Sequence, residues 1–336
     1  MNFAVGYVRN DQHDPGEMHV ERVYRVDAAI KGVESLGLGS DLIVADTISV
    51  SLEDLYLVHP KEYIDKLTNV STSGGAWADE YEETWIGESS TLAAMNAAGT
   101  SVEVMSILRE SKAVNYGFSI IRPPGHHAGP RYPMGFCLLN NIGIVARKLS
   151  TLGEKVMIID IDVHHGNGTQ DIFWDDSNVV YLSIHQNGLY PGTGKLTEIG
   201  GENAILKTLN IPLEAGSAGN VFRMILESII SPTILRESPT WILVSAGFDS
   251  HFKDPLGGFE LSSRDYFNFA NELRQSAGRD TKMLYVLEGG YDLSAIKDST
   301  SASILGLLDG SFNLENETYS EAGTKDVKNA KSYFGF

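Results

Sequence analysis

Apolar and polar residues follow one another along this chain in blocks of two different periods. Short apolar runs recur at residues 118–121, 156–159, 179–184, 241–246 and 283–287, and a polar or glycine-rich segment follows each run. Between the runs, apolar residues return every three or four positions, as on an amphipathic helix. This alternation predicts an α/β fold with a mostly parallel sheet covered by helices on both faces.

The helical period is clearest after Ser89 to Thr91, which can supply an N-terminal cap. The methionines on the apolar face of this helix belong to the core and indicate no cofactor. Residues 71–78 are rich in Ser and Gly and predict a loop, which leads into the mostly acidic segment 79–83. The predicted helices cover residues 20–36, 92–108, 221–230 and 266–275.

Length and composition fit one large α/β domain. The chain has 336 residues, of which 42% are hydrophobic, enough to bury an extensive core. We expect this domain over residues 1–310, followed by a polar extension, 311–336, that docks on the domain or on a partner subunit of a homo-oligomer. No apolar run approaches the length of a membrane span, about 18 residues, and Arg9 and Asp11 interrupt the first apolar stretch. A cytoplasmic protein without a signal peptide or membrane span is therefore expected.

Charge and cysteine content restrict the possible sites. The net charge of −18 argues against nucleic acid as a direct partner, because nucleic-acid binding requires a basic surface. The acidity would attract cationic substrates such as lysine-rich tails or polyamines, or it serves only to keep the protein soluble. Cys137 is the single cysteine, so a disulfide within the chain and a cysteine-rich zinc site are excluded, and we expect it to pack in the interior.

Candidate chemistry is concentrated where the apolar runs end. Asp160, Asp162 and His164 follow the run 156–159 at alternate positions, and alternate residues of a strand point to one side. Burying two carboxylates and an imidazole together is costly without a cation or a hydrogen-bond network. We therefore predict a divalent metal at this position, whereas a shorter motif would more often be a solvated strand end.

Other polar residues occupy corresponding positions after the other runs. His126 and His127, His185, Asp249 and Glu288 each come shortly after one of them. Ligands of parallel α/β sheets bind outside the carboxyl ends of the strands. We therefore expect these side chains to converge on one rim.

The strand ends carry a series of short motifs. They are Arg122-Pro-Pro-Gly-His-His-Ala128, Gly135-Phe-Cys137, Asp160 to Gly168, Tyr190-Pro-Gly-Thr-Gly194, Ala246-Gly-Phe-Asp249, Asp254-Pro-Leu256 and Glu288-Gly-Gly-Tyr291. In this order, the series resembles the histone deacetylase family of metal-dependent amidohydrolases. Gly166-Asn-Gly168 and Asp254-Pro-Leu256 are similar to its class II branch. The resemblance, from about Val58 to Leu308, implies the three-layer α/β/α architecture of the arginase/deacetylase fold.

The resemblance implies a metal site in which Asp162, His164 and Asp249 bind zinc and leave an open position for water and the substrate carbonyl. This donor set would also accept Fe(II), Co(II) or Mn(II). A structural potassium ion, or another monovalent cation, is expected close by, held by Asp160, Asp162, His164 and Ser183 together with backbone oxygens.

For catalysis, the resemblance implies that His127 acts as general base and then as general acid, with His126 as its electrostatic partner. Tyr291 would donate its hydroxyl to the developing oxyanion. Asp160 would orient His126, and Asn167 would orient His127. A carboxylate raises the pKa of the imidazole it holds and a neutral amide does not, so we expect His126 to be charged and His127 to be neutral and basic.

A substrate tunnel is also implied, with apolar walls that sandwich a four-carbon stem. Leu256 disfavours polyamine substrates, because polyamine-selective relatives can carry glutamate there. Many relatives hold the peptide backbone with a rim aspartate, for which Glu83 is the nearest candidate in this chain. The expected lining residues are Gly135, Phe136, Tyr190, Leu256, Gly289 and Gly290.

Two further expectations concern the segment before the first predicted helix and His251. The family often has His-Pro-Glu-Arg-Pro before a helix, where this chain has His19-Val-Glu-Arg-Val23. Arg22 and Arg25 are therefore expected either to contact the site or to cap that region. His251 is expected at the rim of the site.

We therefore expect a zinc-dependent deacetylase that removes an acetyl or related acyl group from acetyl-lysine in proteins or from a small N-acetylated amine. An acetylpolyamine amidohydrolase is the alternative within the same chemistry. An arginase-like ureohydrolase would need further acids where Asn167 and Ser250 stand. A catalytically silent acyl-lysine reader is the alternative from another class, but the complete motif set favours an enzyme.

Overall fold

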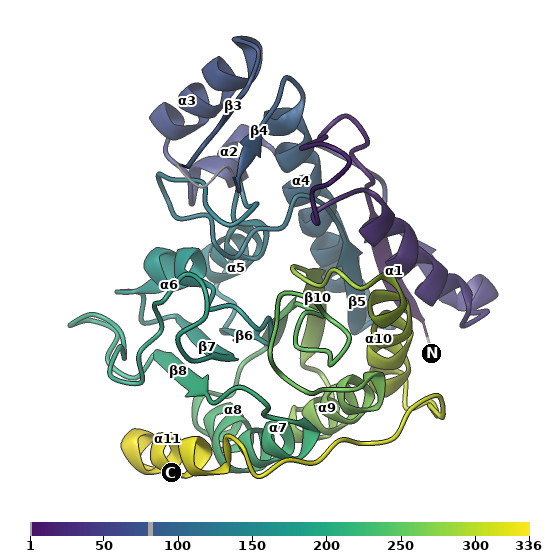
Figure 1. The fold of residues 1–336 in the computed structure, drawn as a ribbon, viewed down its shortest axis with the longest axis vertical. Coiled ribbons are helices and arrows are strands. Elements are labelled where there is room, and N and C mark those ends of the chain that lie inside the picture. Colours follow the sequence, from purple (N-terminus) through teal and green to yellow (C-terminus); the bar gives the residue numbers. More distant parts are fainter. Residues whose placement is uncertain (1, 80–82) are drawn as a thin grey trace.

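The computed structural model describes residues 2–79 and 83–336, and its centre is one eight-stranded parallel sheet (Figure 1). Its strands are β1 (Phe3–Tyr7), β2 (Leu42–Val44), β5 (Tyr116–Ile120), β6 (Val156–Asp160), β7 (Val179–Gln186), β8 (Thr208–Leu213), β9 (Trp241–Ala246) and β10 (Lys282–Leu287). Their order across the sheet is β2-β1-β5-β10-β9-β6-β7-β8. A separate antiparallel pair is formed by β3 (Ala76–Trp77) and β4 (Trp85–Ile86).

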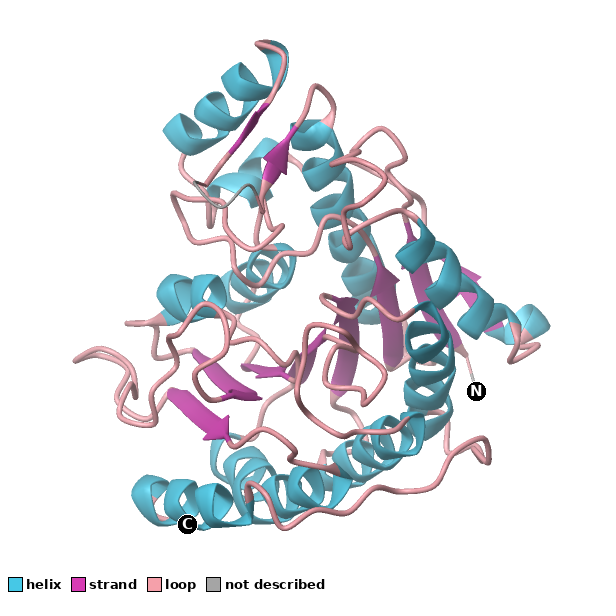
Figure 2. Ribbon diagram, in the orientation of Figure 1, coloured by secondary structure: helices cyan, strands magenta, loops and turns pink. Residues whose placement is uncertain are grey.

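Helices cover both faces of the large sheet, which gives the three-layer α/β/α architecture that the sequence predicted (Figure 2). One layer contains α1 (Tyr24–Glu34), α7 (Gly219–Ile225), the π-helical turn η2 (Leu226–Ile230), α8 (Ser231–Glu237), α9 (Ser263–Ser276), α10 (Leu293–Leu307) and α11 (Thr324–Phe334). The other contains α2 (Leu52–Tyr56), α3 (Lys61–Thr72), α4 (Ser90–Glu110), α5 (Asn141–Thr151) and α6 (Asn167–Phe173). A short 3₁₀ helix, η1 (Gly39–Asp41), precedes β2.

The central strands are mostly apolar because both of their faces are buried. On β6, Met157 and Ile159 pack into the core under α1 and α7 to α11, whereas Val156 and Ile158 pack into the core under α2 to α6. All four side chains are at most 2% exposed. A sheet with one solvated face would instead alternate apolar and polar residues, so the continuous runs were a reliable signal for these strands.

The predicted helices are present, with adjusted boundaries. The helix expected over 92–108 is α4, but Ser89 precedes it without a side-chain capping bond. The segment 221–230 changes from α-helix to the π-helical turn η2. The predicted loop over 71–78 is wrong at two places, because Ser71 and Thr72 complete α3 and Ala76–Trp77 form β3. Within the acidic segment 79–83, residues 80–82 lie outside the described part. No helix in that described part is long and apolar enough to cross a membrane.

The polar C-terminal segment contains α11, which packs beside β8 and α7 (Figure 1). Val327, Ala330 and Phe334 repeat at helical spacing and are buried in the same core as the sheet. The segment is polar overall because only this one stripe of the helix is covered. In this structure the extension therefore docks on the body of the same chain.

Candidate metal centre and active site

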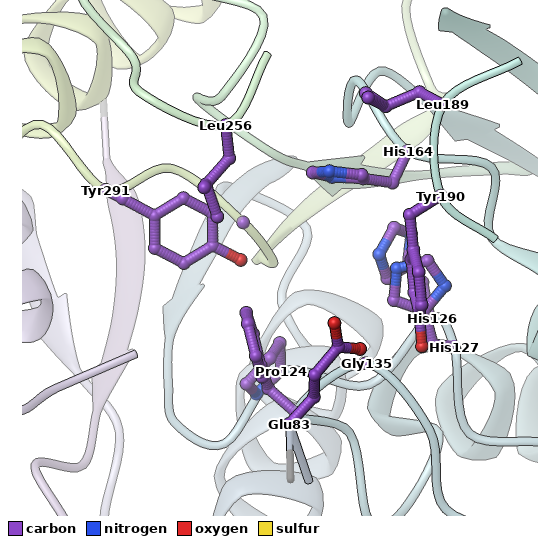
Figure 3. A pocket seen from close by; sticks show the side chains of 12 residues that line it. Glu83, Pro124, His126, His127, Gly135, His164, Leu189, Tyr190, Leu256 and Tyr291 are labelled. Atoms are coloured by element: carbon purple, nitrogen blue, oxygen red, sulfur yellow. The ribbon is translucent and has the colours of Figure 1, made fainter. Parts of the chain in front are cut away.

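The candidate site lies at the carboxyl ends of four adjacent central strands. β5, β10, β9 and β6 are neighbours in the sheet, and the loops that follow them carry the residues singled out in the sequence. These side chains surround one pocket (Figure 3). It is lined by Glu83, Pro124, His126, His127, Gly135, Phe136, His164, Leu189, Tyr190, Leu256, Gly289 and Tyr291.

Asp162, His164 and Asp249 bring three donor atoms together beside this pocket, which His164 lines. The Nδ1 atom of His164 lies 3.1 Å from Oδ1 of Asp162 and 3.2 Å from Oδ2 of Asp249. Ligands bound tetrahedrally to zinc at about 2.0–2.1 Å are themselves about 3.3 Å apart. The spacing of these donors therefore fits a small divalent cation.

The local backbone explains how these donors come to face one another. β6 ends at Asp160, so Asp162 and His164 lie beyond the strand and not on it as predicted. The alternation nevertheless continues, because Ile161 and Val163 point into the core. Backbone N–H groups of Val163 and Gly289 donate to the Asp249 and Asp162 carboxylates, at 2.9 and 2.8 Å, and fix their orientation.

The electrostatics of the three donors also favour a cation. Burial, together with the charge of Asp162, raises the pKa of Asp249 to about 7. Burial alone would lower the pKa of His164, but hydrogen bonds to Asp162 and Asp249 outweigh it and raise the pKa to about 10. Two buried carboxylates thus draw positive charge onto the imidazole between them, which is the role that a bound metal ion would take over.

His126 and His127 stand next to this centre with their rings 4.0 Å apart. Nδ1 of His126 lies 3.1 Å from Oδ2 of Asp160, and Nδ1 of His127 lies 2.8 Å from Oδ1 of Asn167. These are the orienting partners that the resemblance implied. The Asp160 carboxylate also accepts a hydrogen bond from the Tyr181 hydroxyl.

The pKa values of His126 and His127 differ in the expected direction, but groups other than Asp160 and Asn167 also contribute to the difference. Burial would lower the pKa of His126, but the charges of Asp162 and Asp160 raise it to about 10. Burial lowers the pKa of His127 well below its usual value, and the neighbouring His126 and His164 lower it further. The charge of Asp162, whose Oδ2 lies 3.8 Å from Nε2 of His126, therefore contributes to this pKa together with that of the hydrogen-bonded Asp160.

The implied monovalent-cation residues also lie close together. Asp160 and Ser183 are register partners on the adjacent strands β6 and β7. The Ser183 hydroxyl lies 2.9 Å from Nδ1 of His185. A monovalent cation at this position remains a prediction.

Tyr291 enters the pocket from the loop after β10, and its hydroxyl points toward the imidazoles (Figure 3). The carboxylate of Asp254 accepts from the Tyr291 backbone N–H at 2.6 Å and from that of Leu256 at 3.0 Å. Gly290 has a φ of 108°, a backbone conformation that favours glycine. Contrary to the prediction, Gly290 does not line the pocket. Its carbonyl instead accepts from the Arg25 guanidinium at 2.6 Å.

Three residues hold these loops in place, and of these the sequence predicted a role only for Arg25, which was expected to contact the site or to cap its region. Glu288 accepts from the backbone N–H groups of Gly125 and His126, at 2.6 and 3.1 Å. Asp254 fixes the Tyr291 backbone, and Arg25 fixes the glycine turn before it. Glu288 and Asp254 stood inside recognised motifs, and that was the only available signal.

Gly135 and Phe136 form part of the pocket wall. Both have positive φ values, 53° and 68°, and a Cβ at Gly135 would collide with the His127 ring. The tunnel residues expected from sequence thus line the pocket, except for Gly290. Glu83, Pro124 and Leu189 line it as well.

His251 does not lie at the rim of the site, contrary to expectation. It is fully buried, and its Nε2 atom lies 3.4 Å from the Glu315 carboxylate and 3.3 Å from the Ser263 hydroxyl. The segment containing Glu315 covers it. The sequence around His251 does not indicate this burial, because Glu315 lies 64 residues further along the chain.

The entrance region contains a buried charge cluster that sequence analysis did not foresee. The Glu21 carboxylate accepts from the Arg122 guanidinium at 3.0 and 2.8 Å. Nη1 of Arg25 lies 3.3 Å from Oε1 of the same carboxylate. Burial alone would raise the pKa of Glu21, but the two guanidinium groups outweigh it and lower the pKa to about 2. Arg22 is exposed, so only Arg25 contacts the site. The cluster ties the N-terminal segment to the start of the loop that carries His126.

We expect Glu21→Gln to destabilise the fold at neutral pH by about 3–5 kcal/mol, since it leaves a buried guanidinium unpaired. The carboxylate stabilises the folded state fully above its unfolded pKa of 4.5, and this contribution, about 3 kcal/mol, is lost as pH falls through about 2. Urea unfolding between pH 7 and the acid range measures both effects. Glu34→Gln, at an exposed position of α1, is the control. An equal acid dependence in Glu21→Gln and the parent protein would contradict this assignment.

Comparison with known proteins gives a consistent result. A family profile described as the histone deacetylase domain matches residues 19–307. The chloroplastic histone deacetylase 14 of Arabidopsis thaliana is 37% identical, over 90% of this chain and 75% of that protein. A probable deacetylase of Archaeoglobus fulgidus is 34% identical, over 89% of this chain and 84% of that protein. The crystal structure of the HDA15 HD domain superposes with a TM-score of 0.90 at 32% identity, over 99% of this chain and 94% of that one.

Proposed function

This chain belongs to the histone deacetylase family, and from that membership we propose that it is a zinc-dependent deacetylase acting on an N-acetylated primary amine. The observation that carries the proposal is the meeting of the Asp162, His164 and Asp249 donors beside a pocket that His164 lines. His127 and Tyr291 line the same pocket. A metal-activated water needs a base and an oxyanion donor within reach, and this pocket contains both.

Zinc bound by the three donors would supply a polarised carbonyl and a water of lowered pKa. The remaining roles belong to side chains of this chain. His127, neutral and with its Nδ1 atom held by Asn167, accepts the proton of the attacking water and returns it to the leaving amine nitrogen. His126 carries positive charge beside it. Tyr291 donates its hydroxyl to the developing oxyanion, and burial, which raises its pKa well above the usual value, keeps it protonated.

The walls of the pocket support a linear amine as the substrate. Phe136 and Tyr190 present aromatic surface, and Leu256 adds an aliphatic side chain. Such walls fit the methylene stem of acetyl-lysine or of an acetylated polyamine. The ureohydrolase alternative finds no support at Ser250, whose hydroxyl donates to the Ile161 carbonyl at 3.1 Å.

Glu83 distinguishes the two amine classes. Its carboxylate points into the pocket (Figure 3), and burial, followed by the charge of Asp79, raises its pKa. A carboxylate in this position can pair with a second ammonium group on a polyamine or accept an N–H from a peptide backbone. The charge would matter far more for the first interaction than for the second.

The test is acetate release by the zinc-loaded protein from an acetyl-lysyl peptide with neutral flanking residues and from N-acetylated polyamines, in parallel. If a distal ammonium pairs with Glu83, Glu83→Gln should raise KM for the polyamine about threefold to tenfold and change the peptide KM much less. Glu88→Gln, at an exposed position on the other side of β4 that does not line the pocket, is the control.

Each outcome decides between the two substrate classes or against the proposal. Efficient peptide turnover that is insensitive to Glu83→Gln makes acetyl-lysine the substrate class. Polyamine turnover that depends on Glu83 makes the small amine the substrate class. Absence of acetate release from both substrates by the zinc-loaded parent would contradict the proposed function.

A further inference from the structure

A chain of side-chain contacts leads from His127 to the surface through Tyr132. Oδ1 of Asn167 faces Nδ1 of His127 at 2.8 Å, and Nδ2 of Asn167 donates to the Tyr132 hydroxyl at 3.2 Å. The Tyr132 hydroxyl in turn donates to Oδ2 of Asp171 at 2.5 Å. Asn167 and Asp171 lie one turn apart on α6, so a single phenol oxygen bridges two positions on one face of that helix.

The Asp171 carboxylate, at the surface end of this chain of contacts, determines the direction of each hydrogen bond. A carboxylate only accepts, so the Tyr132 hydroxyl must give its proton to Asp171. Burial, with a further contribution from Asp171, raises the pKa of Tyr132, so that proton is retained at neutral pH. The remaining lone pairs of Tyr132 can then only accept, which requires the N–H₂ end of the Asn167 amide to face it. The oxygen end of that amide must therefore face His127.

The direction has a consequence for His127. Because Oδ1 of Asn167 is an acceptor without a proton, Nδ1 of the neutral His127 ring must carry the hydrogen. The other nitrogen, Nε2, is then left without a proton and can act as an acceptor. If the amide turned over, its N–H₂ group would favour the opposite tautomer, in which Nε2 carries the hydrogen and cannot take one up.

The surroundings of Tyr132 are shaped to hold its ring in this place. Tyr132 and Gly129 form an antiparallel bridge, with the Gly129 N–H donating to the Tyr132 carbonyl at 3.0 Å. A Cβ on residue 129 would collide with Cε1 and Cζ of the Tyr132 ring. The glycine therefore provides the space that lets the ring fold back toward Asn167. The other acceptors of Nδ2, the His127 carbonyl and Sδ of Met134, are both 3.5 Å away and weaker.

We propose that Tyr132, anchored by Asp171, is a positioning residue that fixes the amide orientation of Asn167 and thereby the tautomer of His127. Its effect on turnover rests on the proposed deacetylase function, whereas its effect on the tautomer does not. Tyr132 touches neither the donor triad nor the pocket, so its role is separate from substrate or metal binding.

The test uses Tyr132→Phe, which keeps the ring over Gly129 and removes only the hydroxyl. In protein labelled with ¹⁵N-histidine, the Nδ1 and Nε2 shifts of His127 report its tautomer directly. We expect the parent protein to hold the proton on Nδ1 and the variant to show a measurable population with the proton on Nε2. With the zinc-loaded protein, kcat should fall about threefold to tenfold at unchanged KM. This decrease is smaller than the one usually caused by removing a residue that is hydrogen-bonded directly to a metal ligand or catalytic side chain.

Tyr319→Phe is the matched control, since Tyr319 donates to the exposed Glu321 carboxylate at 2.6 Å in the C-terminal segment. It loses the same kind of hydrogen bond and should leave both the His127 shifts and kcat unchanged. Asp171→Ala removes the acceptor at an exposed position and should shift the tautomer in the same direction as Tyr132→Phe. A merely structural role for Tyr132 would lower the unfolding temperature without altering the tautomer.

The outcomes separate this inference from the proposed function. Identical His127 tautomers in the parent, Tyr132→Phe and Asp171→Ala proteins would overturn the inference, whatever the activity. A changed tautomer in a protein that releases no acetate would support the positioning role and contradict the deacetylase proposal. A changed tautomer together with a reduced kcat supports both.

Discussion

Asp249→Asn should leave the protein folded but unable to retain zinc, and should reduce kcat/KM by roughly a thousandfold or more. The substitution replaces one anionic donor of the site with a neutral amide oxygen, and only Asp162 and His164 remain unchanged as donors. Oδ1 of asparagine can still accept from the Val163 backbone N–H, so the loop geometry should survive. Without a metal, burial and the charge of Asp162 raise the pKa of Asp249 to about 7, so a bound cation is what would keep this carboxylate charged.

Three measurements follow for this variant. Metal content after gel filtration should be near one zinc per chain for the parent and near zero for Asp249→Asn. Zinc should raise the unfolding temperature of the parent only, since ligand binding stabilises the state that binds it. In the absence of metal, the variant should unfold at the same or a higher temperature, because one of two neighbouring buried acids has been neutralised.

Asp265→Asn is the control for burial of a carboxylate. Asp265 is buried, accepts from the backbone and side chain of Ser262 and caps α9, outside the site. Its replacement should lower the unfolding temperature and leave the zinc content unchanged. An Asp249→Asn protein that retains zinc with parental affinity would rule out Asp249 as a ligand.

Tyr291→Phe should lower kcat roughly a hundredfold to a thousandfold with little change in KM, which is the usual effect of removing one oxyanion donor. The phenylalanine ring still fills the space between Phe136 and Arg25, whose contacts with Tyr291 are made through the ring. The hydroxyl contributes mainly when charge develops on the substrate oxygen. The loss should therefore appear in kcat and not in substrate affinity.

A tyrosine on β10 provides a close control for this experiment. Tyr285 is buried on the strand that leads to Tyr291, and among the described residues its hydroxyl has no hydrogen-bond partner. Tyr285→Phe should therefore leave kcat and stability nearly unchanged. A Tyr291→Phe protein as active as Tyr285→Phe would exclude Tyr291 as the oxyanion donor and leave that role to another group in the pocket.

The local sequence pattern was sufficient to predict the central strands and to predict that the candidate site residues lie at one edge of the sheet. Strands buried on both faces must be continuously apolar, so β6, β7, β9 and β10 could be found without knowledge of their neighbours. Polar residues just after such strands must lie at the same edge of a parallel sheet. The sequence alone therefore predicted that Asp162, His164 and Asp249 share one rim.

Local pattern failed where a residue's role depends on distant partners. Glu21 became a buried anion only because Arg122, 101 residues away, folds against it. His251 became buried because the segment containing Glu315 covers it. None of these contacts leaves a periodic signal near the residue concerned.

The sequence by itself determined the three-layer architecture, the family and the set of chemical groups gathered at the sheet edge, because these depend on periodicity and on short motifs. The tertiary structure decided the orientation of those groups. It set which end of the Asn167 amide faces His127, which carboxylate holds the Tyr291 loop, and how Glu83 points into the pocket. Orientation depends on hydrogen bonds between segments far apart in the chain, and no local pattern encodes their direction.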